Sequence, residues 1–238
     1  MILPGAGPVV SAAQVPQASG PSCDTDRSMA RASVADRLRD DILRGAFPPG
    51  ERLIELQLTE RFDVGRAAIR AALVDLEAQG LVRREANRGA TVRRISVAEA
   101  VEITEARAVL EGLVARRAAE RATDADGKKL RGIVEQMEAA VESGDKRGYA
   151  ELNRKLHAFL PRVARHQVAS DLIDNLRHRA VHHQFQLAVM PGRAAESLGQ
   201  HRDIVDAVVA GDGPAADRAM HAHLDSVIDT LRQWQGLD

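Results

Sequence analysis

The first part of the chain is defined by the stretches Phe47-Pro48-Pro49-Gly50-Glu51-Arg52-Leu53, Gly80-Leu81-Val82-Arg83-Arg84 and Asn87-Arg88-Gly89-Ala90-Thr91-Val92. The Pro-Pro-Gly run indicates a turn, and the later stretches resemble two short strands joined by a loop. Apolar residues at helical spacing predict helices over 32–44, 55–62 and 66–79. This order predicts a winged helix-turn-helix domain over 31–96, which presents one helix to the major groove of DNA.

Four residues of this domain are candidate DNA contacts. Arg66 and Arg70 lie four apart at the start of the predicted recognition helix, away from its apolar stripe. Because arginine can donate two hydrogen bonds to guanine O6 and N7, we expect both side chains to contact base edges. Arg88, at the tip of the wing, is expected to reach the minor groove or a phosphate, and Gly89 to allow close backbone approach. For Arg66 and Arg70 the alternative is an ordinary solvated helix face.

Composition restricts the class of protein. The 238 residues suffice for two modest domains, and the 3% aromatic content, with abundant Ala, Leu and Arg, favours helix. The formal net charge is −1, yet residues 31–95 contain thirteen Arg and ten acidic residues, a local excess of three positive charges. Cys23 is the only cysteine, which excludes an intrachain disulfide. No apolar run approaches the length of a membrane span, so we expect a cytoplasmic protein without a membrane partner.

The rest of the chain divides into a tail and a helical part. Residues 1–30, rich in Gly, Ala, Pro and Ser, are predicted to form a disordered N-terminal tail. Over 97–235 only helical periodicity is present, interrupted by Gly, Pro and Asp. The predicted helices are 97–121, 124–143, 145–163, 166–189, 194–210 and 213–235. Their short connections favour an antiparallel six-helix bundle, so the fold class is mainly α.

Four side chains on three of these helices form a candidate metal site. His201 and His223 each lie on the apolar stripe of a helix, which predicts that both imidazoles point into the bundle. Asn153 and His157 lie four apart, beside the apolar face of another helix. Imidazoles that face a bundle interior suit a first-row metal such as Zn or Ni. A single inward histidine is more often a hydrogen-bonded core residue, so the metal hypothesis depends on the whole set.

The winged part resembles the GntR family of bacterial transcription regulators, through the Pro-Pro-Gly-Glu-Arg-Leu turn and the Gly-Leu-Val-Arg-Arg segment. The family's recognition helix has the pattern Val-Ser-Arg-Thr-Pro-Val-Arg-Glu-Ala-Leu. Here the corresponding segment is Val64-Gly65-Arg66-Ala67-Ala68-Ile69-Arg70-Ala71-Ala72-Leu73. Both arginines are kept, whereas the capping Ser, a Thr and a Glu are replaced. We therefore expect groove binding to be retained and the operator sequence and affinity to differ.

The helical part, about 99–233, resembles the FCD ligand-binding domain of FadR-type members of that family, with its VanR-like branch as the suggested group. The matching segments are Arg107-Ala108-Val109-Leu110-Glu111, Leu152-Asn153-Arg154-Lys155-Leu156-His157, Pro191-Gly192-Arg193, His201-Arg202-Asp203-Ile204-Val205-Asp206-Ala207 and Met220-His221-Ala222-His223-Leu224. The resemblance implies a metal held by one carboxylate and three histidines, with Asn in place of the carboxylate in some members. Asn153 supplies only a neutral oxygen, which lowers the expected metal affinity.

Arg107 is a candidate effector-binding residue. It lies on the apolar stripe of its helix, and a guanidinium directed at a core needs an anionic partner. One hypothesis is that Arg107 holds a small carboxylate effector above the metal. The alternative is an ion pair with Glu111, four residues further along.

These features favour a homodimeric, ligand-responsive transcription regulator that binds a pseudo-palindromic operator in double-stranded DNA, because one winged helix buries too little surface for strong selectivity. The alternative is a metal-dependent enzyme fused to a DNA-binding domain. No general base or nucleophile is evident near the histidines, so we assign no catalytic residue. A third hypothesis is a regulator whose metal site has decayed.

Overall fold

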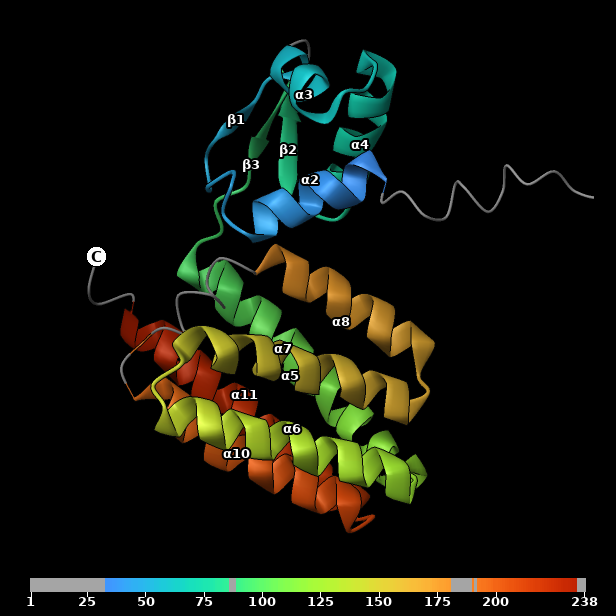
Figure 1. Ribbon diagram of the computed structural model, residues 1–238, viewed down its shortest axis with the longest axis vertical. Coiled ribbons are helices and arrows are strands. Elements are labelled where there is room, and N and C mark those ends of the chain that lie inside the picture. The colour runs from blue at the N-terminus through green and yellow to red at the C-terminus, as the bar shows by residue number, and fades with distance from the viewer. Residues whose placement is uncertain (1–32, 86–88, 181–189, 191, 235–238) are drawn as a thin grey trace, which may run out of the picture. The chain divides into compact units, whose positions relative to one another are not determined.

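The computed structural model describes residues 33–85, 89–180, 190 and 192–234 (Figure 1). The predicted tail, residues 1–30, lies outside this range. The winged part contains α2 (Val34–Leu43), α3 (Glu55–Phe62) and α4 (Arg66–Ala78), with strands β1 (Arg52–Leu53), β2 (Val82–Glu85) and β3 (Gly89–Val92). The predicted helices, turn and hairpin are therefore confirmed, with helix ends that differ by at most two residues from the predicted ones.

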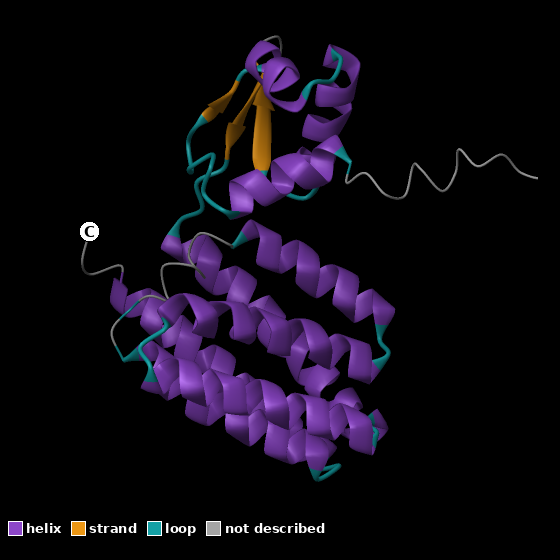
Figure 2. Ribbon diagram, in the orientation of Figure 1, coloured by secondary structure: helices purple, strands orange, loops and turns teal. Residues whose placement is uncertain are grey.

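The three strands form one antiparallel sheet in the order β1-β3-β2 (Figure 2). Leu53 pairs with Ala90, and Val82 pairs with Val92. The two-residue strand β1 was not predicted, because a strand this short has no periodicity of its own and is defined by its hydrogen bonds to β3. Gly89 begins β3 with φ +86°, and a Cβ atom there would collide with the carbonyl oxygen of Leu53. Close packing of β3 against β1 therefore requires glycine at this position.

The winged part has a hydrophobic core of its own. Helix α4 contributes Ile69, Leu73 and Leu76, which are at most 1% exposed and form the predicted stripe. The other buried members come from the remaining helices, the turn and the sheet: Leu38, Ile42, Phe47, Leu53, Leu58, Phe62, Leu81, Val82, Ala90 and Val92. Because this face of α4 is buried, the opposite face of the helix is the one that can contact a partner.

The described residues of the second part form six helices: α5 (Val97–Arg121), α6 (Asp124–Glu142), α7 (Lys146–Ala164), α8 (Gln167–Arg179), α10 (Arg193–Val209) and α11 (Gly213–Trp234). Side chains at the predicted breaks start several of them. Ser96 accepts from the Glu99 N–H at the start of α5, Thr123 and Asp126 form a capping box at α6, and Asp145 caps α7. Helix α5 packs against α7, α8, α10 and α11, whereas α6 packs against α7 and α10. The mainly α fold class is confirmed.

One predicted helix was too long. The sequence predicted a helix over 166–189, but α8 ends at Arg179, and the N–H of Ala180 caps it by donating to the carbonyl groups of Leu176 and Arg177. Between Arg179 and Pro191 the sequence contains neither Gly nor Pro, the residues that usually mark the end of a helix. The sequence therefore gave no indication that α8 ends at Arg179. The remainder of the predicted segment, 181–189, lies outside the described residues.

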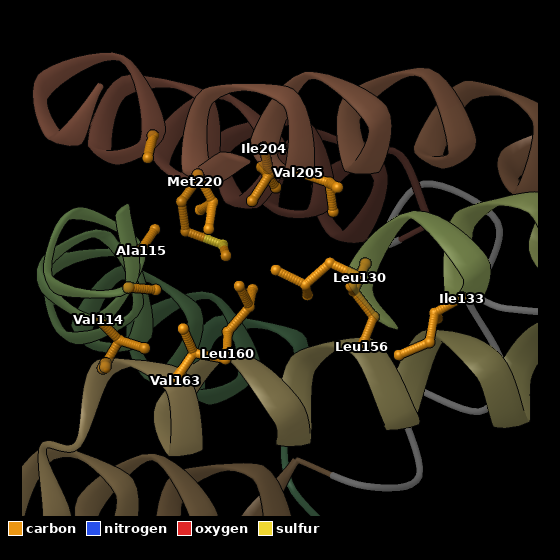
Figure 3. Close-up of a cluster of buried hydrophobic side chains, with 14 of the residues drawn as sticks. Val114, Ala115, Leu130, Ile133, Leu156, Leu160, Val163, Ile204, Val205 and Met220 are labelled. Carbon is orange, nitrogen blue, oxygen red and sulfur yellow. The ribbon is translucent and has the colours of Figure 1, made fainter. Parts of the chain in front are cut away.

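The core of the bundle is aliphatic and lies between the facing helices (Figure 3). Its most buried members include Leu130 and Met137 of α6, Leu156 and Leu160 of α7, and Ile204 of α10, each at most 1% exposed. Close packing of this kind holds side chains in defined rotamers. The polar side chains of the candidate site project from the same helices and are fixed by this packing.

Candidate metal centre and DNA interface

Helix α4 presents the two predicted DNA-contacting arginines on its exposed face. Arg66 and Arg70 are both exposed, and so are Ala67 and Ala71 beside them. These alanines leave little bulk between the helix backbone and a groove, and an alanine methyl group suits contact with a thymine methyl group. Gly65 is the N-cap residue of α4, and it makes no capping hydrogen bond because glycine has no side chain. Arg88 lies outside the described residues.

Arg70 has an ion-pair partner. Its Nε donates to both oxygens of Glu55 at the start of α3, at 2.9 and 3.1 Å. The arginine side chain is 66% exposed, so the pair itself contributes little to stability. Because Nε is the donor, the terminal nitrogens Nη1 and Nη2 remain for the fork-shaped contact that a guanine requires.

The structure brings the three predicted histidines together in the bundle. His157 comes from α7, His201 from α10 and His223 from α11, and they are 6, 0 and 4% exposed. Each offers a ring nitrogen, and these nitrogens lie within 4.8 Å of one another. The Nε2 atoms of His157 and His201 are 3.2 Å apart. Two nitrogens bound to one tetrahedral metal at 2.0–2.1 Å lie roughly 3.3 Å apart, so this spacing suits a shared ion.

The other nitrogen of each imidazole already has a partner. The Nδ1 atom of His157 lies 3.0 Å from Oε2 of Glu111, that of His201 lies 3.3 Å from the Tyr149 hydroxyl, and that of His223 lies 2.8 Å from Oε1 of Gln200. A proton on each Nδ1 satisfies all three contacts and leaves the Nε2 lone pairs free. Such outer hydrogen bonds orient histidine ligands in metal sites. Two Nε2 lone pairs 3.2 Å apart repel unless a cation or proton lies between them.

Asn153 supplies a further unsatisfied atom. Its Oδ1 is buried and has no hydrogen-bond partner among the described residues. Asn153 lies one turn before His157 on α7, on the side of the helix that the sequence predicted. A buried acceptor without a donor is unfavourable, and a bound metal ion would supply the missing partner. The donor set of one amide oxygen and three imidazoles therefore fits a first-row metal.

Burial keeps the imidazoles neutral. It lowers the pKa of His201 and of His223 well below the ordinary histidine value. Burial also lowers the pKa of His157, although its contact with Glu111 opposes this effect. Neutral imidazole is the form that binds a metal, so these side chains are ready ligands near pH 7.

Glu111 connects His157 to two arginines. Its carboxylate accepts from Arg107 at 2.8 Å and from Arg177 of α8 at 2.6 Å, and it is only 3% exposed. Burial by itself would raise the pKa of the Glu111 carboxyl, but the two arginines and His157 outweigh this effect and hold the pKa well below its usual range. Glu111 is therefore an ionised outer partner of the candidate metal site.

Arg107 is buried, as its position on the apolar stripe predicted, and it makes the ion pair with Glu111 that the alternative hypothesis described. Its Nε and Nη2 both donate to Glu111. An effector contact by Arg107 stays a prediction.

Several polar groups around the histidines were not identified from the sequence: Tyr149, Arg177, Arg193, Ser197 and Gln200. Two of them could have been found from the sequence, because residues four apart share a helix face. Tyr149 is four residues from Asn153 on α7, and Ser197 is four residues from His201 on α10.

Replacing Glu111 with glutamine tests its outer-sphere role. The amide keeps the size of the side chain but removes the charge that orients His157 and pairs with the buried Arg107 and the partly buried Arg177. Outer-shell substitutions typically cost 10–100-fold in metal affinity, so we expect a zinc affinity about 10–100-fold weaker, measured by competition with a chromophoric chelator. The variant Glu120→Gln, at an exposed ion pair on the same helix, serves as the control. Equal zinc affinity in Glu111→Gln and the wild type would contradict the role.

The described helices and sheet define a class of protein: a transcription regulator with a winged helix-turn-helix and a helical ligand-binding domain. The model of the bacterial regulatory proteins of the gntR family matches residues 30–92, and the FCD domain model matches residues 102–226. The chain therefore belongs to the GntR family and carries an FCD domain. A VanR-like branch stays a prediction.

Relatives and solved structures agree with this assignment. The HTH-type transcriptional repressor RspR of Escherichia coli K12 is 32% identical over 196 residues, which are 82% of this chain and 86% of the repressor. LutR, an HTH-type transcriptional regulator of Bacillus subtilis 168, is 31% identical over 212 residues, which cover 80% of this chain and 95% of LutR. The solved structure of E. coli McbR/YncC has a TM-score of 0.73 and 23% identity over 85% of this chain and 96% of McbR/YncC, which shows the same fold.

These findings favour the regulator over the fused enzyme, since the families and relatives are transcription regulators rather than enzymes. Among the helices that the structure describes, none combines the length and the apolar character needed to cross a bilayer.

Proposed function

We propose that this GntR regulator binds its operator as a homodimer and that a small carboxylic acid, bound at a metal in the FCD domain, controls DNA binding. The observation that carries the metal part is the set of three buried histidine nitrogens within 4.8 Å of one another. The Asn153 oxygen, which has no hydrogen-bond partner among the described residues, supports it. The domain boundaries 31–96 and 97–235 and a cytoplasmic location on bacterial DNA belong to the same proposal.

The chemistry of the donors supports an acidic effector. His157, His201, His223 and Asn153 would hold the metal, and all four are neutral, so a divalent ion would keep its full charge. A four-coordinate protein set can also expand to admit one more oxygen ligand. A carboxylate supplies both the oxygen and the compensating charge. Zn and Ni are the metals that we expect.

The buried charges around the histidines also support an anion. The side chains of Arg107, Arg177 and Arg193 are 7, 14 and 6% exposed. Glu111 pairs with the first two, and Arg193 pairs with Glu196, which is 56% exposed. Buried charge is costly unless it is compensated. Adding a divalent metal increases the positive excess, and a carboxylate ligand reduces it.

Exposed apolar side chains on two helices support self-association. Val109 of α5 is 65% exposed, and Val168 and Leu172, one turn apart on α8, are 68 and 50% exposed. Helices α5 and α8 pack against each other, so these residues belong to one pair of neighbouring helices. A two-fold dimer would cover such a surface and place two winged helices on inverted half-sites.

Selection from random DNA duplexes, followed by footprinting and light scattering, tests the proposal. We expect the zinc-loaded protein to enrich an inverted repeat, to protect both half-sites and to have the mass of a dimer at micromolar concentration. Adding citrate or malate is expected to change the operator affinity at least about fivefold, the lower end of allosteric coupling. A monomer both free and on DNA would contradict the dimer, and unselective binding to DNA would contradict the regulator.

A further inference from the structure

The least satisfied buried cation in the helical part is Arg193, the first residue of α10. It is 6% exposed, and its Nη1 donates to the Ser226 hydroxyl at 2.6 Å and lies 3.1 Å from Glu196. Its Nη2 is buried and has no hydrogen-bond partner within the described part of the chain. A buried charged donor without an acceptor is expensive to maintain. This nitrogen therefore calls for an acceptor that the described residues do not supply.

Arg193 lies on the same buried stripe as the histidine cluster. Arg193, Ser197 and His201 follow one another at four-residue spacing on α10, and all three are buried. Ser226, which contacts Arg193, is three residues from His223 on α11, and Glu196, which contacts Ser226, is four residues from Gln200, the partner of His223. Along α10, Arg193 is therefore about two turns from His201, whereas its partners Ser226 and Glu196 are each about one turn from His223 and Gln200.

Further polar side chains lie between Arg193 and the histidine cluster. The Tyr149 hydroxyl lies 3.3 Å from Nδ1 of His201 and is also hydrogen-bonded to Ser197. The region from His201 to Arg193 is therefore polar and positive in an otherwise aliphatic bundle.

Arg107 is less available for an effector. Its Nε and Nη2 are both engaged by Glu111, which also pairs with Arg177. If Arg107 turned to bind an effector, the buried carboxylate of Glu111 would lose one of its two arginine partners. Arg193 instead has a terminal nitrogen to offer without losing either of its present contacts.

We propose that Arg193 is the anchor for the anionic end of the effector, with its buried Nη2 donating to a carboxylate oxygen. The inference rests on the proposed function and names the ligand more closely. One carboxylate would contact Arg193 while a second oxygen group of the same molecule reaches the metal. The fitting class is a short dicarboxylic or hydroxy-dicarboxylic acid, and acetate is too short to span both points.

Calorimetry on the zinc-loaded, full-length protein tests this assignment with succinate, malate, citrate and acetate. We expect at least one of the three longer acids to bind the wild type about tenfold or more tightly than acetate. Arg193→Gln should remove that preference, and Arg193→Lys, which keeps the charge but not the fork, should reduce it. The control is Arg202→Gln, an exposed arginine of the same helix that pairs with Glu138.

The same samples separate this inference from the proposed function. Zinc content and operator binding without acid are expected to be equal in the wild type and all three variants, and melting curves check that each variant is folded. If Arg193→Gln or Arg193→Lys keeps the wild-type preference, or if none of the longer acids binds the wild type more tightly than acetate, the anchor is overturned. Loss of zinc from the wild type would instead contradict the metal site, and lack of operator binding would contradict the regulator.

Discussion

Replacing His201 with alanine is expected to remove the metal from the FCD domain. His201 is fully buried, and its Nε2 lies 3.2 Å from that of His157, so its removal leaves two imidazoles and one amide oxygen. Loss of a ligand should exceed the 10–100-fold cost typical of outer-shell changes, and we expect zinc affinity to fall by more than about 100-fold. Elemental analysis after zinc loading and dialysis measures the effect, and binding of the acid should weaken with it.

Two further variants make the result specific to the site. His221→Ala changes a partly exposed histidine of α11 that pairs with Asp217, and it should leave zinc content unchanged. Asn153→Asp adds a negative charge to an otherwise neutral ligand set, and it should tighten zinc binding. If the wild type loaded with Zn or Ni keeps no metal through dialysis, the metal site is wrong and the three histidines are hydrogen-bonded core residues.

Replacing Arg66 or Arg70 with alanine is expected to cost about 1–3 kcal/mol of operator binding per half-site and to relax the preference for particular bases. Both side chains project from the exposed face of α4, and arginine contacts to guanine edges carry discrimination of this size. Fluorescence anisotropy with the selected operator and with single-base variants, at one fixed salt concentration, measures both effects. In a homodimer the loss applies at each half-site.

Arg61→Ala provides the matched control in the same domain. Arg61 pairs with Asp41 at 2.8 Å and lies over the ring of Phe47, so its charge is already used within the protein. We expect its replacement to change affinity little and equally for all sequences. Wild-type operator affinity and base preference in both the Arg66 and the Arg70 variants would exclude α4 as the recognition helix.

Much of the fold and part of the candidate site could be predicted from periodicity alone. The stripe Ile69, Leu73 and Leu76 fixed the buried face of α4 and, with it, the exposed face that carries Arg66 and Arg70. The same reasoning placed His201 and His223 inside the bundle. A repeat of 3.6 residues sets the direction of a side chain from its helix, and this direction survives in any packing that buries the apolar stripe.

The sequence by itself thus determined the winged helix, the mainly α bundle and the inward direction of the histidines. Only the tertiary structure decided that Glu111 joins Arg107, Arg177 and His157 and that α8 ends at Arg179. It also decided that a terminal nitrogen of Arg193 has no acceptor among the residues that the structure describes. The reason is physical: helical periodicity fixes where a side chain points, whereas its partner depends on which helices become neighbours. That choice is made by packing among residues that are far apart in the sequence.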